Sequence, residues 1–434
     1  MDNLSELDRK NIWHPFTSLE AGEDPILIEK AEGIYLYSSD GRKIIDAVSS
    51  WWVNLHGHSH PAIANAVAIQ AQTLEHVIFA GFTHEPAIRL SKNLLTILPQ
   101  NQVKIFFSDN GSTAVEVALK MAFQFWYNQG INNKKKVVAL RGAYHGDTFG
   151  SMSVGERGAF TAPFSPYLFD VAYIDFPTAF NEDVVMTQFR NLLRAEEVGA
   201  FIYEPLVQAA AGMRMYSPEL LDTLILEAKK QDVVCIADEV FTGFGRTGKM
   251  FASNYLTNDP DIIAVSKGIT GGSMALGVTS CCEKIVSAFR SNKNEKTFFH
   301  GHSYTANPIA CAAANASFEL LVNKNCQDQI SMIERQHMAF KQKIEETGNV
   351  QEVRCRGTIL ALELKTQEGT SYFNEVRKKI LGYFLSKNIL LRPLGNVIYI
   401  VPPYVIQQHE LNQIYSCIEQ FLLKSRLNIQ SPDV

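Results

Sequence analysis

Short apolar runs without polar alternation recur through the middle of the chain, each followed by a turn and a longer segment with polar residues. The runs lie at 105–107, 136–140, 200–203, 233–237 and 262–265. Strands that are buried on both faces have this pattern, because helices cover both sides of their sheet. The pattern therefore predicts an α/β fold with a mostly parallel sheet and helices on both faces.

The two ends of the chain depart from this pattern. Residues 26–28, 33–37 and 43–46 have the composition of short strands, and a hairpin turn at 38–41 joins the last two. From about residue 316 onward, charged helices and short strands follow one another in an α+β arrangement. We therefore expect a small antiparallel element near the N-terminus and a second domain at the C-terminus.

An acid and a lysine follow two of the central apolar runs. Asp238 comes after the run at 233–237, and Lys267 comes shortly after the run at 262–265. Ligands bind at the carboxyl ends of the strands in sheets of this kind. Pyridoxal phosphate (PLP) needs a lysine to form a Schiff base and an acid to keep its pyridine nitrogen protonated. Taken alone, the two residues also suit a structural ion pair.

Three further strand ends carry polar groups. Ser112 opens a helix whose N-terminus suits an anion such as phosphate. Ser112 or Thr113 is alternatively only a helix cap, and the two interpretations are compatible. Tyr144 follows the run at 136–140, where it can stack on a flat ring, and Glu204 follows the run at 200–203. Five strands that deliver polar groups to one edge favour a shared binding site over coincidence.

The glycine-rich turn at 243–248 offers another interpretation. Gly243, Gly245 and Gly248 match the GxGxxG pattern of dinucleotide-binding sites. That pattern requires the glycines to open a helix directly after a strand, and residues 249–254 show no helical spacing. The spacing therefore argues against a nicotinamide-type site.

Composition narrows the functional classes. The 434 residues are 46% hydrophobic and 20% charged, which is typical of a globular chain with about two to three domains. A net charge of -5 provides no basic surface for nucleic acid, and no apolar run reaches the roughly 18 residues of a membrane-spanning helix. Seven cysteines without a C-x-x-C pair and an acidic N-terminus without a signal-peptide pattern indicate a cytoplasmic protein.

Three alternating histidines raise the question of a metal site. On an extended strand His56, His58 and His60 would share one face. Gly57 and Pro61 interrupt such a strand, and the neighbouring residues add neither a carboxylate nor a cysteine. We therefore expect no metal.

Taken together, these segments resemble the class III aminotransferases of fold type I, over nearly the whole chain. The family motif is matched by DEVFTGFGRTG at 238–248 and SKG at 266–268. Segments that resemble one branch of the family are WHPFT at 13–17, SWW at 50–52, YHGDT at 144–148, GMRMY at 212–216 and CAAANAS at 311–317. Members of that branch transfer an amino group from S-adenosylmethionine to 8-amino-7-oxononanoate, and the product, 7,8-diaminononanoate, is a precursor of biotin.

The resemblance also implies a domain organisation and an assembly. Residues 1–45 and 316–434 would form a split α+β small domain, and residues 46–315 would form the large PLP-binding domain. Proteins of this family are homodimers whose active sites lie at the subunit interface. The expected partners are therefore small-molecule substrates and a second copy of the chain, without nucleic acid or membrane.

Carried over residue by residue, the resemblance assigns a set of cofactor contacts. Lys267 would bind PLP covalently and Asp238 would contact its pyridine nitrogen, while Tyr144 would pack on its ring. We expect these three residues to be catalytic. The further cofactor contacts are expected from Gly111, Ser112, Glu204 and, reaching the phosphate in the neighbouring subunit, Ser303.

The resemblance assigns substrate contacts as well. Arg392 would bind the substrate carboxylate by a bidentate pair, and Trp51 and Trp52 would line the substrate channel. The other expected contacts are Phe16, Gly301 and the pair Asp147 and Arg246 near the donor site. Phe16 stands where the family often has Tyr, and HSY at 302–304 replaces the commoner PTF. Both departures concern the amino donor and not the cofactor.

Several alternatives stay open at this point. Lysine is an alternative amino donor for the same acceptor. Another ω-amino acid aminotransferase, acting on ornithine, acetylornithine or 4-aminobutyrate, is an alternative within the class. A PLP-binding regulator is a third, although the basic stretch that its DNA-binding module requires is absent from the sequence.

Overall fold

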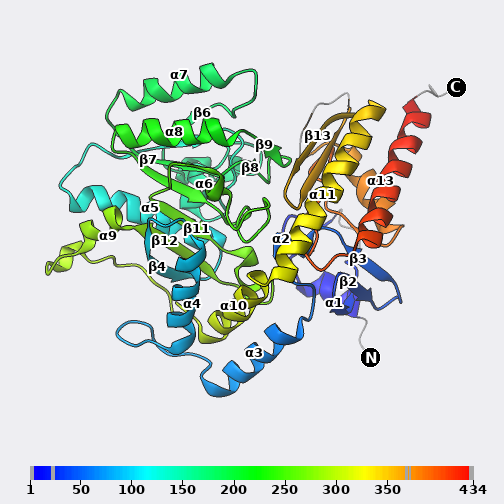
Figure 1. The fold of residues 1–434 in the computed structure, drawn as a ribbon, viewed down its shortest axis with the longest axis horizontal. Helices are drawn as coiled ribbons and strands as arrows, with labels where there is room; N and C mark the ends of the chain where they lie inside the picture. The colour runs from blue at the N-terminus through cyan, green and yellow to red at the C-terminus, as the bar shows by residue number, and fades with distance from the viewer. Residues whose placement is uncertain (1–3, 21–24, 367–369, 371–372, 430–434) are drawn as a thin grey trace.

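The structure is a computed structural model that describes residues 4–20, 25–366, 370 and 373–429. Figure 1 shows two lobes. The lobe on the left contains the middle of the chain and is built on a seven-stranded sheet, whereas the lobe on the right contains the two ends of the chain. The predicted fold class is confirmed by the arrangement described below.

The large sheet is mostly parallel. Its strands, in spatial order, are β4 (Gln102–Ser108), β12 (Gly277–Cys282), β11 (Ile262–Val265), β10 (Val234–Asp238), β7 (Val198–Tyr203), β5 (Lys136–Leu140) and β6 (Val171–Ile174). Strand β12 pairs antiparallel with β11 and β4, and the other neighbouring strands pair parallel. The sequence analysis did not predict β12, because buried Thr279 and Ser280 interrupt its apolar residues. Their hydroxyl groups donate to Ala114 and Gln102.

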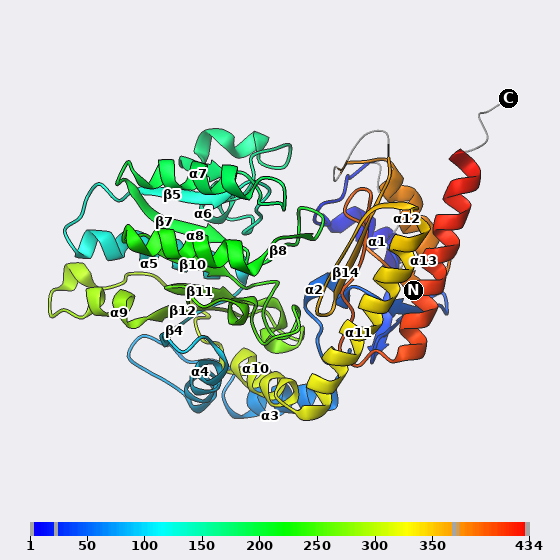
Figure 2. The ribbon, with the colours of Figure 1, turned by 45° about the horizontal axis from the view of Figure 1, so that its top comes forward.

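The lack of polar alternation in the strands has a direct structural cause. Along β10, Val234 and Ile236 pack in the hydrophobic core on one face of the sheet, and Cys235 and Ala237 pack in the core on the other face. Each face is covered by helices, as Figure 2 shows. The covering helices are α5 (Gly111–Asn128), α6 (Phe149–Val154) and α9 (Glu283–Phe289) on one face, and α4 (Glu85–Ile97), α7 (Glu182–Leu193) and α8 (Pro218–Lys230) on the other.

The second lobe joins the two ends of the chain. Its strands are β1 (Ile28–Glu32), β2 (Tyr35–Ser38), β3 (Lys43–Asp46) and β15 (Ile389–Leu390) in one sheet, and β13 (Val350–Arg356), β14 (Ile359–Leu364) and β16 (Val397–Ile400) in another. Strand β15 pairs parallel with β3, so the α+β lobe is split in sequence as expected. The strand predicted at 26–28 begins only at Ile28, because its pairing with β2 runs from Ile28 to Glu32.

Helices complete both lobes. They are α1 (Leu4–Asn11), the short irregular α2 (Ser49–Trp52), α3 (Pro61–Thr73), α10 (Pro308–Leu321), α11 (Lys324–Thr347), α12 (Val376–Leu385) and α13 (Gln408–Ile429). Short elements are β8 (Val207–Gln208), β9 (Arg214–Met215) and 3-10 turns at Ala162–Tyr167, Ala252–Tyr255, Lys267–Thr270 and Asn294–Lys296. In the described ranges no helix has both the length and the apolar character needed to cross a membrane.

The expected domain boundary at residue 316 lies inside helix α10. This helix packs against α3 and α4 of the large lobe along its length. A domain boundary within a continuous packed helix is not expected, since boundaries lie where few contacts cross. We therefore propose that the C-terminal part of the small lobe begins after Leu321.

Candidate active site

A cavity of about 460 Å³ opens at the carboxyl ends of the parallel strands. It receives one predicted site residue after each of β4, β5, β7, β10 and β11, and these residues are Ser112, Tyr144, Glu204, Asp238 and Lys267. Its volume lies in the range of small-molecule sites. The structure thus brings the five predicted strand-end residues together, while their individual roles stay predictions.

Lys267 lies partly buried in the cavity wall, where β11 ends. Its φ of 42° is left-handed, which costs free energy for a residue other than glycine and is most often found at functional sites. Exclusion of water lowers the pKa of the Lys267 amine, although the carboxylates of Asp238 and Glu204 act in the opposite direction. A lower pKa increases the share of neutral amine, which is the form that attacks carbonyl compounds.

Asp238 is held by His145, a residue that the sequence analysis did not assign to the site. Oδ2 of Asp238 lies 2.7 Å from Nδ1 of His145, and its Oδ1 accepts the amide of Val240 at 3.1 Å. Both Asp238 and His145 are buried. The position of His145 beside Tyr144 was the one available signal, but only the folded backbone shows that its ring turns toward Asp238.

Glu204 is a second buried acid in the cavity wall. Its Oε1 accepts the amide of Tyr144 at 3.0 Å, and its Oε2 accepts the amide of Ala209 at 3.1 Å. Desolvation raises the pKa of Glu204 to about 7, and the nearby His145 counteracts part of this effect. Glu204 therefore has a proton to give or take near neutral pH.

The N-terminus of helix α5 forms one end of the cavity. The side chain of Asn110 accepts the amide of Thr113 at 3.0 Å, and its carbonyl accepts the amide of Ala114 at 3.0 Å. The amides of Gly111 and Ser112 find no acceptor among the described residues, and both residues line the cavity. Free amides at the positive end of a helix dipole suit a phosphate group.

Tyr144 and Asp147 interact with each other at the exposed side of the cavity. The Tyr144 hydroxyl donates to Oδ2 of Asp147 at 2.9 Å, and the Asp147 amide donates to Oγ of Ser112 at 3.2 Å. Loss of solvent and the Asp147 carboxylate raise the pKa of Tyr144 well above its usual value. The phenol therefore stays protonated and acts as a hydrogen-bond donor.

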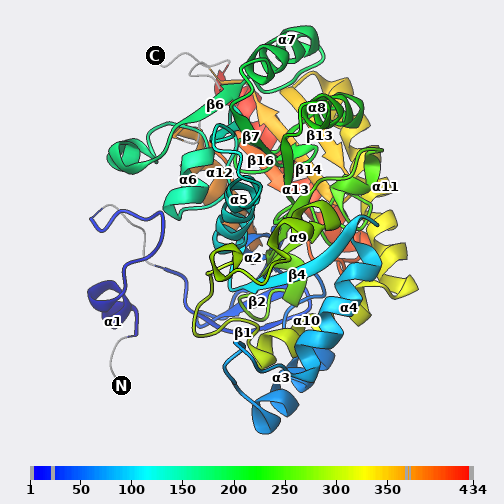
Figure 3. The same ribbon diagram turned by 90° about the vertical axis from the view of Figure 1, so that its left-hand side faces the viewer.

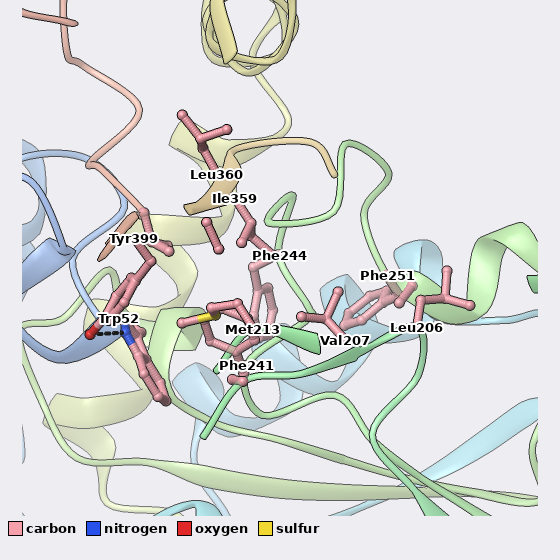
Figure 4. Close-up of a cluster of buried hydrophobic side chains, with 14 of the residues drawn as sticks. Trp52, Leu206, Val207, Met213, Phe241, Phe244, Phe251, Ile359, Leu360 and Tyr399 are labelled. Atoms are coloured by element: carbon pink, nitrogen blue, oxygen red, sulfur yellow. Dashed lines mark hydrogen bonds between the residues drawn. The ribbon is translucent and has the colours of Figure 1, made fainter. Parts of the chain in front are cut away.

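Trp52 forms the opposite, apolar wall, and its indole is fixed on two sides. Its Nε1 donates to the hydroxyl of Tyr399 at 3.1 Å, and its ring lies 4.9 Å from that of Phe241. Figure 4 shows this hydrogen bond and the surrounding buried side chains. Nζ of Lys267 lies 5.1 Å from the centre of the indole, so the aromatic face borders the reactive amine.

Trp51, Arg392 and Phe16 form a second group outside the cavity wall. Cζ of Arg392 lies 4.0 Å from the centre of the Trp51 ring, and the rings of Phe16 and Trp51 are 5.7 Å apart. The parallel pairing of Leu390 with Asp46 explains how residues so distant in sequence meet, because both segments leave the sheet at the same edge. The three predicted substrate contacts therefore form a cluster.

The expected pair between Asp147 and Arg246 is wrong for this chain. The guanidinium of Arg246 is buried and donates to the carbonyls of Pro402 at 2.8 Å and Asn54 at 3.2 Å. The carboxylate of Asp147 accepts from Tyr144 instead. The glycine-rich turn directs Arg246 inward between the two lobes. This direction could not be predicted from the residue types in the sequence.

Gly301 and Ser303 are the two predicted site residues that lie apart from the others. Both are exposed, and neither lines the cavity. Sequence reasoning assigned Ser303 to the neighbouring subunit, so its position in a single chain does not contradict that prediction.

Two of the three alternating histidines contact different parts of the chain. Nε2 of His56 contacts Oγ of Ser317 at 3.1 Å, and Nε2 of His58 contacts Oδ2 of Asp46 at 2.8 Å. Within the described part of the chain, no group of three or more histidine, cysteine, aspartate or glutamate side chains is arranged to hold a metal ion.

Comparisons with known proteins show the family of the chain. A family model described as "Aminotransferase class-III" matches residues 18–422. The adenosylmethionine-8-amino-7-oxononanoate aminotransferase of Synechococcus elongatus is 45% identical, over 95% of this chain and 98% of its own length. The crystal structure of the enzyme of that name from Methanocaldococcus jannaschii has a TM-score of 0.90 at 34% identity, covering 96% of this chain and 98% of the other. A PLP-bound amine transaminase from an uncultivated Pseudomonas species has a TM-score of 0.88 at 28% identity. The match covers 95% of this chain and 98% of the other.

Proposed function

Because the chain belongs to the class III aminotransferases, which depend on PLP, we propose that it transfers an amino group from S-adenosylmethionine to 8-amino-7-oxononanoate. The product would be 7,8-diaminononanoate, in biotin biosynthesis. The observation that carries the proposal is the full-length similarity to relatives of that name. It is supported by Trp52 beside the Lys267 amine and Trp51 beside the Arg392 guanidinium.

The cavity fits PLP at both of its charged ends. The free amides of Gly111 and Ser112 would hold the phosphate, and Asp238 would hold the pyridine nitrogen. A Cβ on Gly111 would lie 2.7 Å from Cγ1 of Val240, so only glycine leaves the helix end open there. When bound, the cofactor supplies an electron sink for the carbon from which a proton is removed.

The chain's own residues would handle the charges and the proton. The Asp238 carboxylate, held by His145 and the Val240 amide, would keep a proton on the pyridine nitrogen. Nζ of Lys267, with its lowered pKa, would take a proton from the substrate carbon and return it. Tyr144 and Trp52 would cover the two sides of the site and exclude water.

The acceptor has a long apolar chain that ends in a carboxylate. Trp52 and Trp51 offer the apolar surface, and the guanidinium of Arg392 against Trp51 offers the cation for the carboxylate. An acceptor with a long chain would bury more apolar surface against the two indoles than one with a short chain. This is the reason to favour 8-amino-7-oxononanoate over substrates of the 4-aminobutyrate type.

The donor uses the same site before the acceptor does. S-adenosylmethionine carries a sulfonium and an adenine, and the exposed rings of Phe16 and Trp51 suit both. Phe16 lacks the hydroxyl of a tyrosine, and one hydrogen bond contributes about 0.5–1.5 kcal/mol, which does not exclude this donor. Lysine is the alternative donor.

A homodimer is part of the proposal. In a dimer, Ser303 would reach the partner's phosphate site, which it does not approach within its own chain. Exposed apolar side chains lie close to Ser303 in sequence, namely Phe299 and Tyr304, and others lie on and after helix α1, which Figure 3 shows projecting from the body. A cytoplasmic location would suit the seven cysteines, all of which are free thiols.

Half-reactions test the donor and the acceptor separately. The PLP-loaded enzyme is mixed with S-adenosylmethionine or with lysine alone, and the absorption of the cofactor is followed until it reaches its amine form. The aminated enzyme is then mixed with 8-amino-7-oxononanoate, and with the aldehydes that correspond to the rival ω-amino acids. If lysine converts the cofactor to its amine form and S-adenosylmethionine does not, the proposed donor is wrong. If the enzyme turns over only 4-aminobutyrate or ornithine, the proposed function is wrong.

A further inference from the structure

The segment that carries the two tryptophans is held in an unusual backbone conformation. Within residues 48–54, called the tryptophan segment below, Ser49, Ser50 and Trp52 have φ values of 51°, 59° and 67°. The segment contains no glycine, which is the residue that adopts such values at little cost. Left-handed residues persist only where the surroundings hold them, and they gather at functional sites.

The carboxylate of Asp46 holds the N–H side of this segment. It is fully buried at the end of β3. Its Oδ1 accepts the amides of Val48 at 3.2 Å and Ser50 at 2.9 Å, and its Oδ2 accepts the Ser50 hydroxyl at 3.0 Å. A buried carboxylate needs several donors to offset its lost hydration, and the left-handed segment supplies most of them.

His58 supplies the remaining donor and connects back to the segment. Its Nε2 lies 2.8 Å from Oδ2 of Asp46, so this nitrogen carries the proton. Its Nδ1 lies 3.2 Å from Nδ2 of Asn54 and accepts from that amide. The chain from Asp46 through His58 to Asn54 therefore closes a loop of hydrogen bonds around the tryptophan segment.

The segment reaches both parts of the site. Trp52 borders Nζ of Lys267, and Trp51 contacts the guanidinium of Arg392. A shift of the backbone between Asp46 and Asn54 would move both rings, because they are adjacent in the chain. Correct placement of such rings pre-organises a binding site.

We infer that Asp46 and His58 are positioning residues that hold the tryptophan segment in its left-handed conformation and thereby set the affinity for the amino acceptor. Neither residue lines the cavity, so they act through Trp51 and Trp52 and do not touch the substrate. The inference rests on the proposed function only for the identity of the acceptor.

His58→Ala and His58→Gln test this inference, with His60→Ala as the matched control. Alanine removes the contact to Asp46, whereas glutamine offers a donor and an acceptor in its place. His60 is the N-cap of helix α3, and its Nδ1 accepts the amide of Ala62 at 3.3 Å. Asp46→Asn, which replaces one acceptor oxygen by a donor, is a second variant that tests the carboxylate itself.

Two measurements on the PLP-loaded enzyme decide the outcome. Hydrogen exchange should show the amides of residues 48–54 exchanging about tenfold faster or more in His58→Ala, with the rest of the chain unchanged. Steady-state kinetics should show KM for the acceptor raised about tenfold, the size of one lost hydrogen bond to a charged group, with kcat within about twofold. His58→Gln should restore most of the slow amide exchange and most of the low KM. His60→Ala should resemble the unchanged enzyme in amide exchange and in KM.

Other results would overturn the inference. Unchanged exchange in the segment would show that Asp46 and His58 do not hold it. A lower kcat at constant KM, or no recovery in His58→Gln, would show that His58 has a different role. If no variant, nor the unchanged enzyme, turns over 8-amino-7-oxononanoate, the proposed function fails, and the exchange measurement still decides whether His58 positions the segment.

Discussion

Nδ1 of His145 lies 2.7 Å from Oδ2 of Asp238, and both residues are buried at the carboxyl end of the large sheet. His145 follows β5 and Asp238 ends β10, so the contact crosses β7, the strand between them. Nε2 of His145 has no partner among the described residues. His145 thereby orients the acid that would face the cofactor nitrogen.

Replacing Asp238 by asparagine should lower kcat by several orders of magnitude. A neutral amide no longer holds a proton on the pyridine nitrogen, so the cofactor becomes a poor electron sink. Single-turnover rates at saturating donor measure this effect. A loss below about tenfold, roughly 1.4 kcal/mol, would contradict the role of Asp238.

Replacing His145 by leucine should lower kcat by about 10- to 100-fold with little change in KM. The variant removes one hydrogen bond from the Asp238 carboxylate, and bonds to charged groups contribute about 1.5–3 kcal/mol. His145→Gln, which keeps a donor, serves as the control and should recover most of the activity. If kcat falls equally in His145→Leu and His145→Gln, His145 does not act through its hydrogen bond to Asp238.

Replacing Lys267 by alanine should leave PLP bound without a covalent link and abolish repeated turnover. The phosphate site and Asp238 remain, whereas the amine that moves the proton is lost, and such groups contribute about 10²- to 10⁴-fold. Absorption spectra and dialysis measure the bound cofactor, and product formation measures turnover. Lys249→Ala, outside the cavity, is the matched control, and a near-native rate in Lys267→Ala would refute the assignment.

Replacing Arg392 by alanine should remove the preference for a free carboxylate. In the unchanged enzyme we expect KM for 8-amino-7-oxononanoate to be about 100-fold below that for its methyl ester, because a charge-assisted bidentate pair is lost in the ester. In Arg392→Ala the two values should become nearly equal. Arg42→Ala, which alters an arginine paired with Asp40 on the small lobe, should keep the preference.

Glu204 should make the stability of the cofactor-free enzyme depend on pH. Its pKa in the folded protein is about 7, above its ordinary value of 4.5, so the folded state binds more protons between these values. The contribution of Glu204 to the free energy of unfolding is therefore fully present below pH 4.5 and is lost as pH rises to about 7. Glutamine at this position lacks that dependence.

The comparison of Glu204→Gln with the unchanged enzyme measures this effect. We compare the free energy of unfolding of Glu204→Gln with that of the unchanged enzyme at each pH. The difference, variant minus unchanged enzyme, should rise by up to about 3 kcal/mol from about pH 4.5 to pH 7.5. Urea unfolding at fixed protein concentration gives both values. Glu227→Gln is the control, since hydrogen bonds from Lys230 and Arg190 lower the pKa of that half-buried acid. A difference that stays constant with pH would contradict the raised pKa.

Strands β4, β5, β7, β10 and β11 of the large sheet, and the residues that follow them, could be predicted from the sequence alone, whereas β6 and β12 were not predicted. A parallel sheet with both faces covered leaves no polar position inside its strands, so apolar runs mark them and their ends mark the edge where ligands bind. Asp238 directly follows one such run and Lys267 follows another after Ser266, and the structure places both in one cavity. Strand β12 was not predicted, because Thr279 and Ser280 interrupt its apolar residues. The hydroxyl groups of both residues form hydrogen bonds inside the protein.

The contacts between distant segments were decided only by the tertiary structure. The sequence gives no indication that His145 turns toward Asp238, or that Arg246 turns away from Asp147 to bind backbone carbonyls between the lobes. Such contacts depend on the direction in which loops leave the sheet and on the packing of the two lobes. The left-handed conformation of the tryptophan segment was also decided only by the folded structure, because no glycine marks it and its bonds to the buried carboxylate of Asp46 depend on the backbone path after β3.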